Sequence, residues 1–241
     1  MQQTLCTALA SSDGSLFRTV EHLLASLSAF GIDNLSIEME SEEVPIFDGS
    51  ATNWCTTLVD AGIVEQARMK RHIRVLKPVE FVHENRSIRV EPADGRFLSV
   101  RMDLAGFGDM SWHGEIDAGT FARDIAPARS FGRLKWALPL KFYHLFSGQP
   151  ILRGANLHNV AAIWGNRVIG GMRLPDEPAR HRALDVLGDL SLAGAPILGG
   201  VTAFRPGHDI NYAFVAKLMQ QTDAWEYVEV KPAGFGEGQS F

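Results

Sequence analysis

A helix–turn–strand unit occurs twice in this chain, and the repetition constrains the fold more than any other feature. Residues 20–39, VEHLLASLSAFGIDNLSIEM, carry apolar side chains at helical spacing up to a glycine and then alternate apolar and polar residues, as a half-buried strand does. Residues 179–204, ARHRALDVLGDLSLAGAPILGGVTAF, show the same order. A further helix is predicted after each unit, over residues 52–62 and 208–221. The repetition therefore predicts an α+β fold, a two-layer sandwich of sheet and helices built from two α/β units related by a pseudo-twofold axis.

A polar stretch, EQARMK at residues 65–70, separates the two units and marks a domain boundary. We expect a short first domain over residues 1–66, a second domain over residues 71–230 and a loose tail over residues 231–241. The other expected elements are a strand at 3–10, strands within 72–92 and at 96–104, a helix at 117–128 capped by Asp117, a short helix at 141–148 and a hairpin at 159–171 that turns at Gly165–Asn166.

Composition places the chain among ordinary globular proteins and excludes several function classes. It has 241 residues, of which 46% are hydrophobic and 21% charged, and its net charge is -5 at pH 7. The acidic balance argues against nucleic acid as the partner. Two cysteines, Cys6 and Cys55, are too few for a disulfide framework, and no apolar run reaches the roughly 18 residues that a membrane span needs. We therefore expect a cytoplasmic protein without a transmembrane segment.

The second unit carries a polar stripe in HRALDVLGD, residues 181–189. His181, Asp185 and Asp189 follow one another at four-residue steps, so on a helix their side chains share one face. Such stripes are typical of a solvated helix surface. The repetition suggests another interpretation, because a pseudo-twofold axis would bring the two helix starts together and place His22 beside His181.

Three of these side chains suit a metal ion. His22, His181 and Asp185 offer two imidazoles and a carboxylate, a set that holds Zn²⁺ at catalytic sites and leaves a position for water. Fe²⁺ accepts the same ligands. Glu21 directly precedes His22 and is a candidate for the base that takes the proton of that water.

A second proton carrier is expected at His208, near the start of the helix that follows the second unit. Asp189 completes the stripe and would hold His208 as an imidazolium. Taken one at a time these patterns are weak, because a Glu-His dipeptide and a His-x-x-x-Asp spacing occur by chance. Spacing alone therefore leaves both interpretations open, a solvated helix face and a metal site.

Several motifs occurring in order resemble one family. TVEHLLASLSAFGIDNLSIEM, VPIFDGSA, ARSFG, RHRALDVLGDL and GHDIN are together similar to the UDP-3-O-acyl-N-acetylglucosamine deacetylase family, the zinc hydrolases of lipid A synthesis. The resemblance runs from about Thr4 to about Val230. It implies two α/β domains related by a pseudo-twofold axis, with the active site between them. It also implies zinc binding by His22, His181 and Asp185, a general base at Glu21, and a general acid at His208 with Asp189 behind it.

The same resemblance implies residues that contact the substrate. Ser130 stands where the family has a threonine that helps to hold the oxyanion, so a hydroxyl is retained. Phe131 and Gly132 keep the rest of that motif. Leu5, Cys6 and Thr7 match a family segment near the mouth of the site.

Departures from the family pattern concern the substrate. Leu104 takes the position of a phenylalanine that stacks on uracil, and Gly106-Phe107 replaces a His-Pro pair. A leucine cannot supply aromatic stacking, although Phe107 would partly compensate. Arg182 stands for a lysine, which retains charge but not geometry. The segment at 134–152 is apolar enough to line an acyl-chain passage, and equally fits plain core.

Family members also carry further residues before the segment that begins here at Gln3. The first unit is therefore expected to be truncated at its N-terminus and to leave a sheet edge open. A partner subunit in a homo-oligomer would cover such an edge, as would the second domain, unless the domain is genuinely pared down. A start codon assigned too far downstream is a further interpretation.

These observations predict a zinc-dependent amidohydrolase that removes an acetyl group from an N-acetylated amino sugar or a similar amine, a small-molecule N-acyl substrate. The altered residues favour a shortened paralogue with a changed substrate. The first alternative is the lipid A pathway deacetylase itself. An alternative of another class is a non-catalytic paralogue that binds a ligand or regulates a partner.

Overall fold

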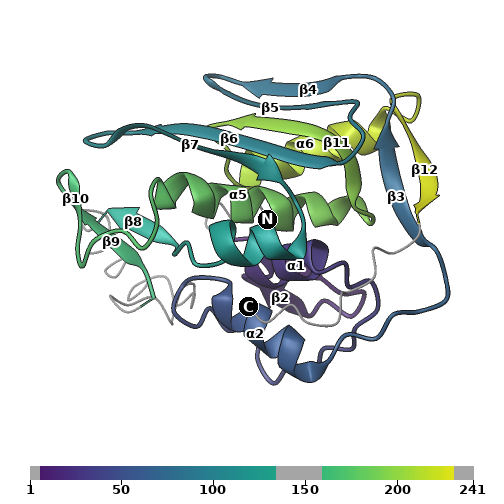
Figure 1. Cartoon of the computed structure of the whole chain (residues 1–241), viewed down its shortest axis with the longest axis horizontal. Coiled ribbons are helices and arrows are strands. Elements are labelled where there is room, and N and C mark those ends of the chain that lie inside the picture. The colour runs from purple at the N-terminus through teal and green to yellow at the C-terminus, as the bar shows by residue number, and fades with distance from the viewer. Residues whose placement is uncertain (1–5, 134–158, 231–241) are drawn as a thin grey trace.

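A mixed β-sheet forms one layer of the molecule, and helices cover one of its faces (Figure 1). The structure is a computed structural model that describes residues 6–133 and 159–230. Helices α5 (Glu177–Leu190) and α6 (His208–Gln220) pack directly against the sheet, and α1 (Glu21–Ala29) packs on α5. The α+β class that the sequence predicts is confirmed.

Strand β11 (Ile197–Phe204) is the central strand of the sheet. It pairs parallel with β3 (Lys70–Val75) at its beginning and antiparallel with β5 (Arg86–Glu91) further along the same edge. Strand β6 (Arg96–Leu104) lies parallel to it on the other edge. Three outer strands pair antiparallel with their neighbours: β12 (Trp225–Val230) with β3, β4 (Val79–His83) with β5, and β7 (Gly108–Glu115) with β6.

The core lies between this sheet and the helices. Apolar residues at every second position of β5 and β6 are buried, whereas Phe97 on the other face of β6 is exposed. Burying one such Val, Ile or Leu side chain contributes roughly 1.5–3 kcal/mol of transfer free energy. The alternation that predicts half-buried strands in the sequence is therefore the alternation that builds the core. The buried residues concerned are Ile88, Val90, Leu98 and Val100.

Two smaller predicted features are present. Asp117 caps α3 (Ala118–Thr120), because its Oδ1 accepts a hydrogen bond of 2.8 Å from the backbone N–H of Thr120. The helix continues as a π-helical turn over Phe121–Ile125.

The predicted hairpin is formed by β9 (Ala161–Trp164) and β10 (Arg167–Val168), which pair on either side of Gly165–Asn166. Strand β8 (Phe131–Arg133) pairs parallel with β9. This small sheet places the ARSFG motif next to the start of α5. The predicted helix at 141–148, the passage segment at 134–152 and the tail lie outside the described residues.

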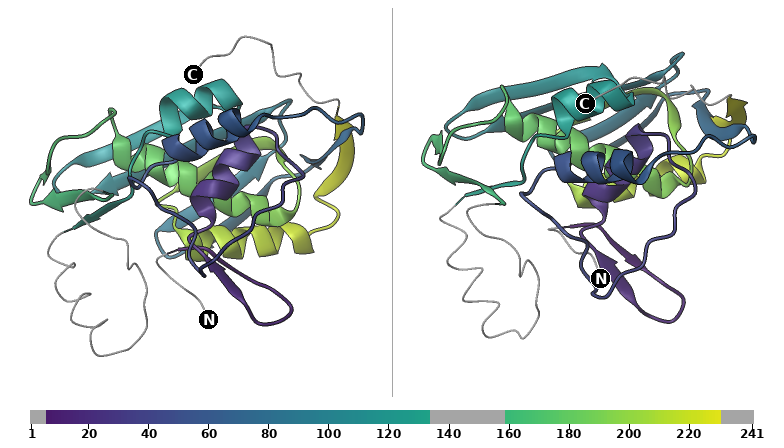
Figure 2. Two further views of the ribbon diagram at one scale, coloured as in Figure 1. Left: turned by 90° about the horizontal axis from the view of Figure 1, so that it is seen from below. Right: turned by 60° about the horizontal axis from the view of Figure 1, so that its bottom comes forward.

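The first unit has the predicted helices but lacks one predicted strand. Helix α2 (Thr52–Ala61) ends at Gly62 as expected, and β1 (Ala8–Ala10) pairs with β2 (Leu16–Arg18) in a hairpin that extends away from the main sheet (Figure 2). The strand predicted at 34–40 is wrong, because this segment is irregular.

The irregular segment has a simple physical explanation. Leu35 and Ile37 alternate with polar residues as in a strand, yet each is about half exposed. A strand is stable only when a neighbour supplies backbone hydrogen bonds, and the bridge recorded next to this segment joins Arg18 and Glu43. The open sheet edge expected from the resemblance stays a prediction. Cover by a partner subunit stays a prediction, as does the division into domains at residues 66 and 71.

No helix within residues 6–133 and 159–230 is both long enough and apolar enough to cross a membrane.

Candidate metal and proton-transfer site

The site lies where α5 crosses the beginning of α1. Gly188 permits this close approach, because a Cβ atom added there would lie 2.2 Å from the carbonyl oxygen of Glu21. The imidazole rings of His22 and His181 are consequently 5.1 Å apart between centroids. His22 thus lies beside His181, as the repetition in the sequence predicts.

Three buried side chains from these helices form a cluster with the donor set of a metal site. One potential ligand atom from each of His22, His181 and Asp185 lies within 4.8 Å of the other two. The Nδ1–H of His181 donates to the carbonyl of Ala128 at 3.1 Å, which leaves the Nε2 lone pair facing Asp185 Oδ1 at 3.5 Å. Nδ1 of His22 is buried and has no hydrogen-bond partner among the described residues. An unpaired buried nitrogen beside a second lone pair and a carboxylate fits a bound cation.

The electrostatics of the cluster keep its members in the protonation states that metals require. Burial and the neighbouring charge of His181 lower the pKa of His22 to about 3, and burial also lowers the pKa of His181. Burial opposes ionisation of Asp185, but His181, His208 and Arg182 outweigh it and hold the pKa at about 2. Two neutral imidazoles and one carboxylate suit Zn²⁺ and also Fe²⁺.

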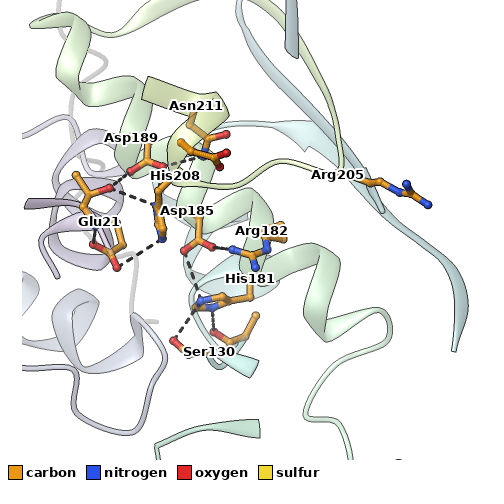
Figure 3. Close-up of polar contacts among 12 residues, drawn as sticks. Glu21, Ser130, His181, Arg182, Asp185, Asp189, Arg205, His208 and Asn211 are labelled. Carbon is orange, nitrogen blue, oxygen red and sulfur yellow. Dashed lines mark hydrogen bonds and ion pairs between the residues drawn. The ribbon is translucent and has the colours of Figure 1, made fainter. Parts of the chain in front are cut away.

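Glu21 and His208 face each other beside this cluster (Figure 3). Glu21 Oε1 lies 3.9 Å from His208 Nε2, and Oε2 accepts a hydrogen bond of 3.0 Å from the backbone N–H of Thr7. Burial raises the pKa of Glu21 to about 8, although the charge of His208 acts against it. A carboxylate with a raised pKa is a competent proton acceptor near neutral pH.

His208 is held as an imidazolium by Asp189. Its Nδ1–H donates to Asp189 Oδ2 at 2.8 Å, and Asn211 donates to the same oxygen at 2.7 Å. The Thr7 hydroxyl donates to the other oxygen of Asp189. Burial opposes protonation of His208, but the Asp189 hydrogen bond and the charges of Asp185, Asp189 and Glu21 raise its pKa to about 10.

Ser130 borders the cluster from the side of β8. Its hydroxyl lies 3.2 Å from Nε2 of His181, and its backbone N–H donates to the carbonyl of Gly49 at 2.7 Å. Gly49 itself has φ of +81°, and a Cβ there would meet the carbonyl oxygen of Asn159 at 1.8 Å. Only glycine therefore fits the IFDGSA loop at this contact, which joins the first unit to the ARSFG motif.

A buried ion pair between Arg129 and Glu177 holds the backbone next to Ser130. Glu177 accepts hydrogen bonds from the backbone N–H of Arg129 at 3.0 Å and from its Nε at 2.8 Å. It also accepts one from the backbone N–H of Arg173 at 2.9 Å. Glu177 is 1% exposed, so this pair anchors the segment just before β8, which carries Ser130, to the start of α5.

Not all of the predicted substrate-binding residues have a contact with the site. The Phe131 ring lies edge-on to the ring of His181 at 6.2 Å, and Cys6 is buried close to Glu21. Gly132 has room for a Cβ, since its nearest neighbour would be Val160 at 3.7 Å. Leu5 lies outside the described residues.

Arg182 contacts the metal cluster, because its Nη1 donates to Asp185 Oδ2 at 2.8 Å. Leu104, Phe107 and Phe131 each pack against a small buried cluster of Met102, Met110 and Ala179. An aromatic ring is therefore present close to the altered position 104.

The sequence placed Thr7 in the family segment near the mouth of the site, but it predicted neither the bonds of Thr7 to Glu21 and Asp189 nor the roles of Asn211 and the Arg129–Glu177 pair. Asn211 was accessible in principle, since it follows His208 by three residues and shares its helix face. The other contacts join residues far apart in the chain, and no local pattern indicates them.

Buried imidazole and carboxylate ligands beside a Glu–His pair form the kind of arrangement found in metal-dependent hydrolases. A family profile described as LpxC: UDP-3-O-acyl N-acetylglycosamine deacetylase matches residues 1–220. The chain belongs to this family, which confirms the resemblance seen in the sequence.

Relatives with the name UDP-3-O-acyl-N-acetylglucosamine deacetylase cover most of the chain. The protein of Shewanella sp. (strain ANA-3) is 36% identical over 233 residues, which are 94% of this chain and 74% of the relative. The protein of Histophilus somni (strain 129Pt) is 35% identical over 230 residues, 93% of this chain and 73% of the relative.

Proposed function

We propose that the chain is a metal-dependent deacetylase that hydrolyses the acetamide group of an N-acetylated amino sugar. The observation that carries this proposal is the cluster of His22, His181 and Asp185 beside the Glu21–His208 pair. A structural role alone would not require four buried polar side chains and the largely buried His208, with pKa values shifted in opposite directions.

Hydrolysis of an amide adds water across the C–N bond and releases a carboxylic acid and an amine. A divalent metal ion held by His22, His181 and Asp185 would lower the pKa of a water molecule and polarise the acyl carbonyl. Glu21 takes a proton from the attacking water. The Ser130 hydroxyl donates a hydrogen bond to the carbonyl oxygen as negative charge develops on it. His208 gives its Nε2 proton to the leaving nitrogen while Asp189 holds the imidazolium at Nδ1.

The proposed substrate differs from that of the lipid A enzyme in one part, the nucleotide attached to the amino sugar. Leu104 offers no aromatic face, and the nearby Phe107 is partly buried against the apolar cluster of Met102, Met110 and Ala179. A nucleotide base would therefore find less stacking surface than the family pattern provides. Related N-acetylated amino sugars without the nucleotide are the favoured substrates.

The direct test is acetate release from UDP-linked and UDP-free N-acetyl sugars, assayed side by side with metal-loaded protein. We expect turnover that stops when a chelator removes the metal and that does not need the nucleotide. Turnover of the acylated UDP sugar alone would identify the chain as the lipid A pathway enzyme and contradict the altered substrate. Absence of turnover on every N-acetyl amine with metal bound would contradict catalysis and favour a binding or regulatory role.

A further inference from the structure

Arg182 lies on α5 between two members of the metal cluster, one residue after His181 and three before Asp185. Its Nη1 donates to Asp185 Oδ2 at 2.8 Å, whereas the other oxygen, Oδ1, faces Nε2 of His181 at 3.5 Å (Figure 3). The two oxygens of the Asp185 carboxylate therefore have different partners. One faces the imidazoles, and the other is held by the guanidinium.

The guanidinium of Arg182 is itself fixed by an aromatic ring. Its central carbon lies 5.0 Å from the centroid of the Phe131 ring, within the range of a cation–π contact. Phe131 in turn meets the ring of His181 edge-on at 6.2 Å. A planar guanidinium can stack on a ring and donate a hydrogen bond in its own plane at the same time, which an ammonium cannot do.

Other arginines bind aspartates outside the metal cluster. Arg86 forms a two-point ion pair with Asp209, Arg205 pairs with Asp103, and Arg101 bonds Asp109. Within the described ranges, Arg182 is the arginine with an ion pair to a member of the metal cluster.

We propose that Arg182 is a positioning residue for Asp185, which holds the carboxylate so that a single oxygen is presented to the metal. This inference rests on the proposed function, since it requires that the cluster bind an ion. It extends the role in substrate binding that the family resemblance implies for this position. Partners that orient a metal ligand typically change metal affinity by about 10- to 100-fold when they are removed.

If Arg182 acted only through its charge, its removal would change the metal affinity in the opposite direction. Arg182 carries a positive charge close to the site of a dication, so its removal would relieve repulsion and tighten metal binding. Loss of positioning would weaken metal binding. Neutral and charged replacements of the same residue therefore separate the two effects.

The experiment measures the Zn²⁺ dissociation constant by competition with a chelator, which needs no substrate, for the wild type, Arg182→Gln and Arg182→Lys. Arg101→Gln is the matched control, because it removes an arginine bonded to an aspartate outside the cluster. Phe131→Leu is a second test that keeps the apolar packing and removes the stacking ring. Circular dichroism checks that each variant is folded, and kcat and KM are then measured with the N-acetyl sugar that the wild type hydrolyses.

We expect Arg182→Gln to bind Zn²⁺ about 10- to 100-fold more weakly, Phe131→Leu to show a smaller loss, and Arg182→Lys to recover part of the affinity. Arg101→Gln should match the wild type. Unchanged or tighter binding by Arg182→Gln, with only KM raised, would overturn the positioning role and leave the proposed function intact. A wild-type chain that binds no metal would overturn both.

Discussion

The two units of this chain share a motif but differ in how much structure supports it. In the second unit, α5 is packed between a broad mixed sheet and α1, and nearly all of its residues are buried. In the first unit, α1 is accompanied by α2, a short hairpin and the irregular segment 34–40. The candidate site nevertheless draws on both, with Glu21 and His22 from one helix and His181 and Asp185 from the other. What the site requires is therefore the crossing of the two helices, and a complete sheet is needed only beneath α5.

The largest effect is expected at that crossing. Gly188→Ala would place a Cβ 2.2 Å from the backbone oxygen of Glu21, so α1 must move away from α5. We expect loss of metal binding and a fall of about 3 kcal/mol in the free energy of unfolding, from denaturant titration. Gly200→Ala is the control, since nothing lies within 4 Å of the added atom. Equal stability and metal content in both variants would show that the crossing is not the essential feature.

The next effect is chemical and should leave both units folded. His208→Gln removes the proton carrier without touching the three candidate ligands, so acetate release should fall by about 10²- to 10⁴-fold at unchanged Zn²⁺ affinity. Tyr212→Phe on the exposed face of the same helix is the control and should keep full activity. If His208→Gln retained the wild-type rate, the assignment of the acid would be wrong.

A smaller effect concerns the pH dependence that Asp189 imposes. His208 acts as an imidazolium with a pKa of about 10, so it keeps its proton below that pH, and activity should be lost as the pH rises through it. Asp189→Asn removes the hydrogen bond and charge that raise this pKa, and the alkaline limb of kcat/KM should move to lower pH by roughly one to three units. Asp223→Asn, which alters an exposed partner of Lys77, should leave the limb in place. An alkaline limb that ignored Asp189→Asn would belong to another group.

The smallest effect tests the unpaired segment of the first unit directly. Leu35→Thr alters a side chain that is 51% exposed, and we expect a change within about 0.5 kcal/mol in the free energy of unfolding. Val90→Thr, in the buried core of β5, places a hydroxyl among apolar groups and should cost roughly 1–3 kcal/mol. A cost for Leu35→Thr as large as for Val90→Thr would indicate that residues 34–40 are paired in solution.

The same contrast explains how far the sequence could be interpreted. Strands of the main sheet were predictable from alternation, because β11, β6 and β5 pair with one another within the described chain. Alternation at 34–40 is equally regular, yet it predicts a strand wrongly because pairing depends on a neighbour that the pattern cannot supply.

For the candidate site, the repeated unit and the helical spacing of its residues were sufficient to predict that His22 lies beside His181. The partners that tune the site were not predictable in this way. Thr7 reaches Asp189 across 182 positions, and Arg129 reaches Glu177 across 48, so neither contact leaves a local signature. Arg182 was recognised as a departure from the family, but its bond to Asp185 emerges only from the folded helix.

The central claim is that the crossing of α1 and α5 builds one metal site from two units, and metal stoichiometry tests it most directly. Elemental analysis of purified protein, dialysed against Zn²⁺ and freed of excess, should give one ion per wild-type chain. His22→Gln and His181→Gln, one from each unit, should each lose that ion while remaining folded. Retention of the ion by either variant, or acetate release by a wild-type chain that holds no metal, would contradict the account.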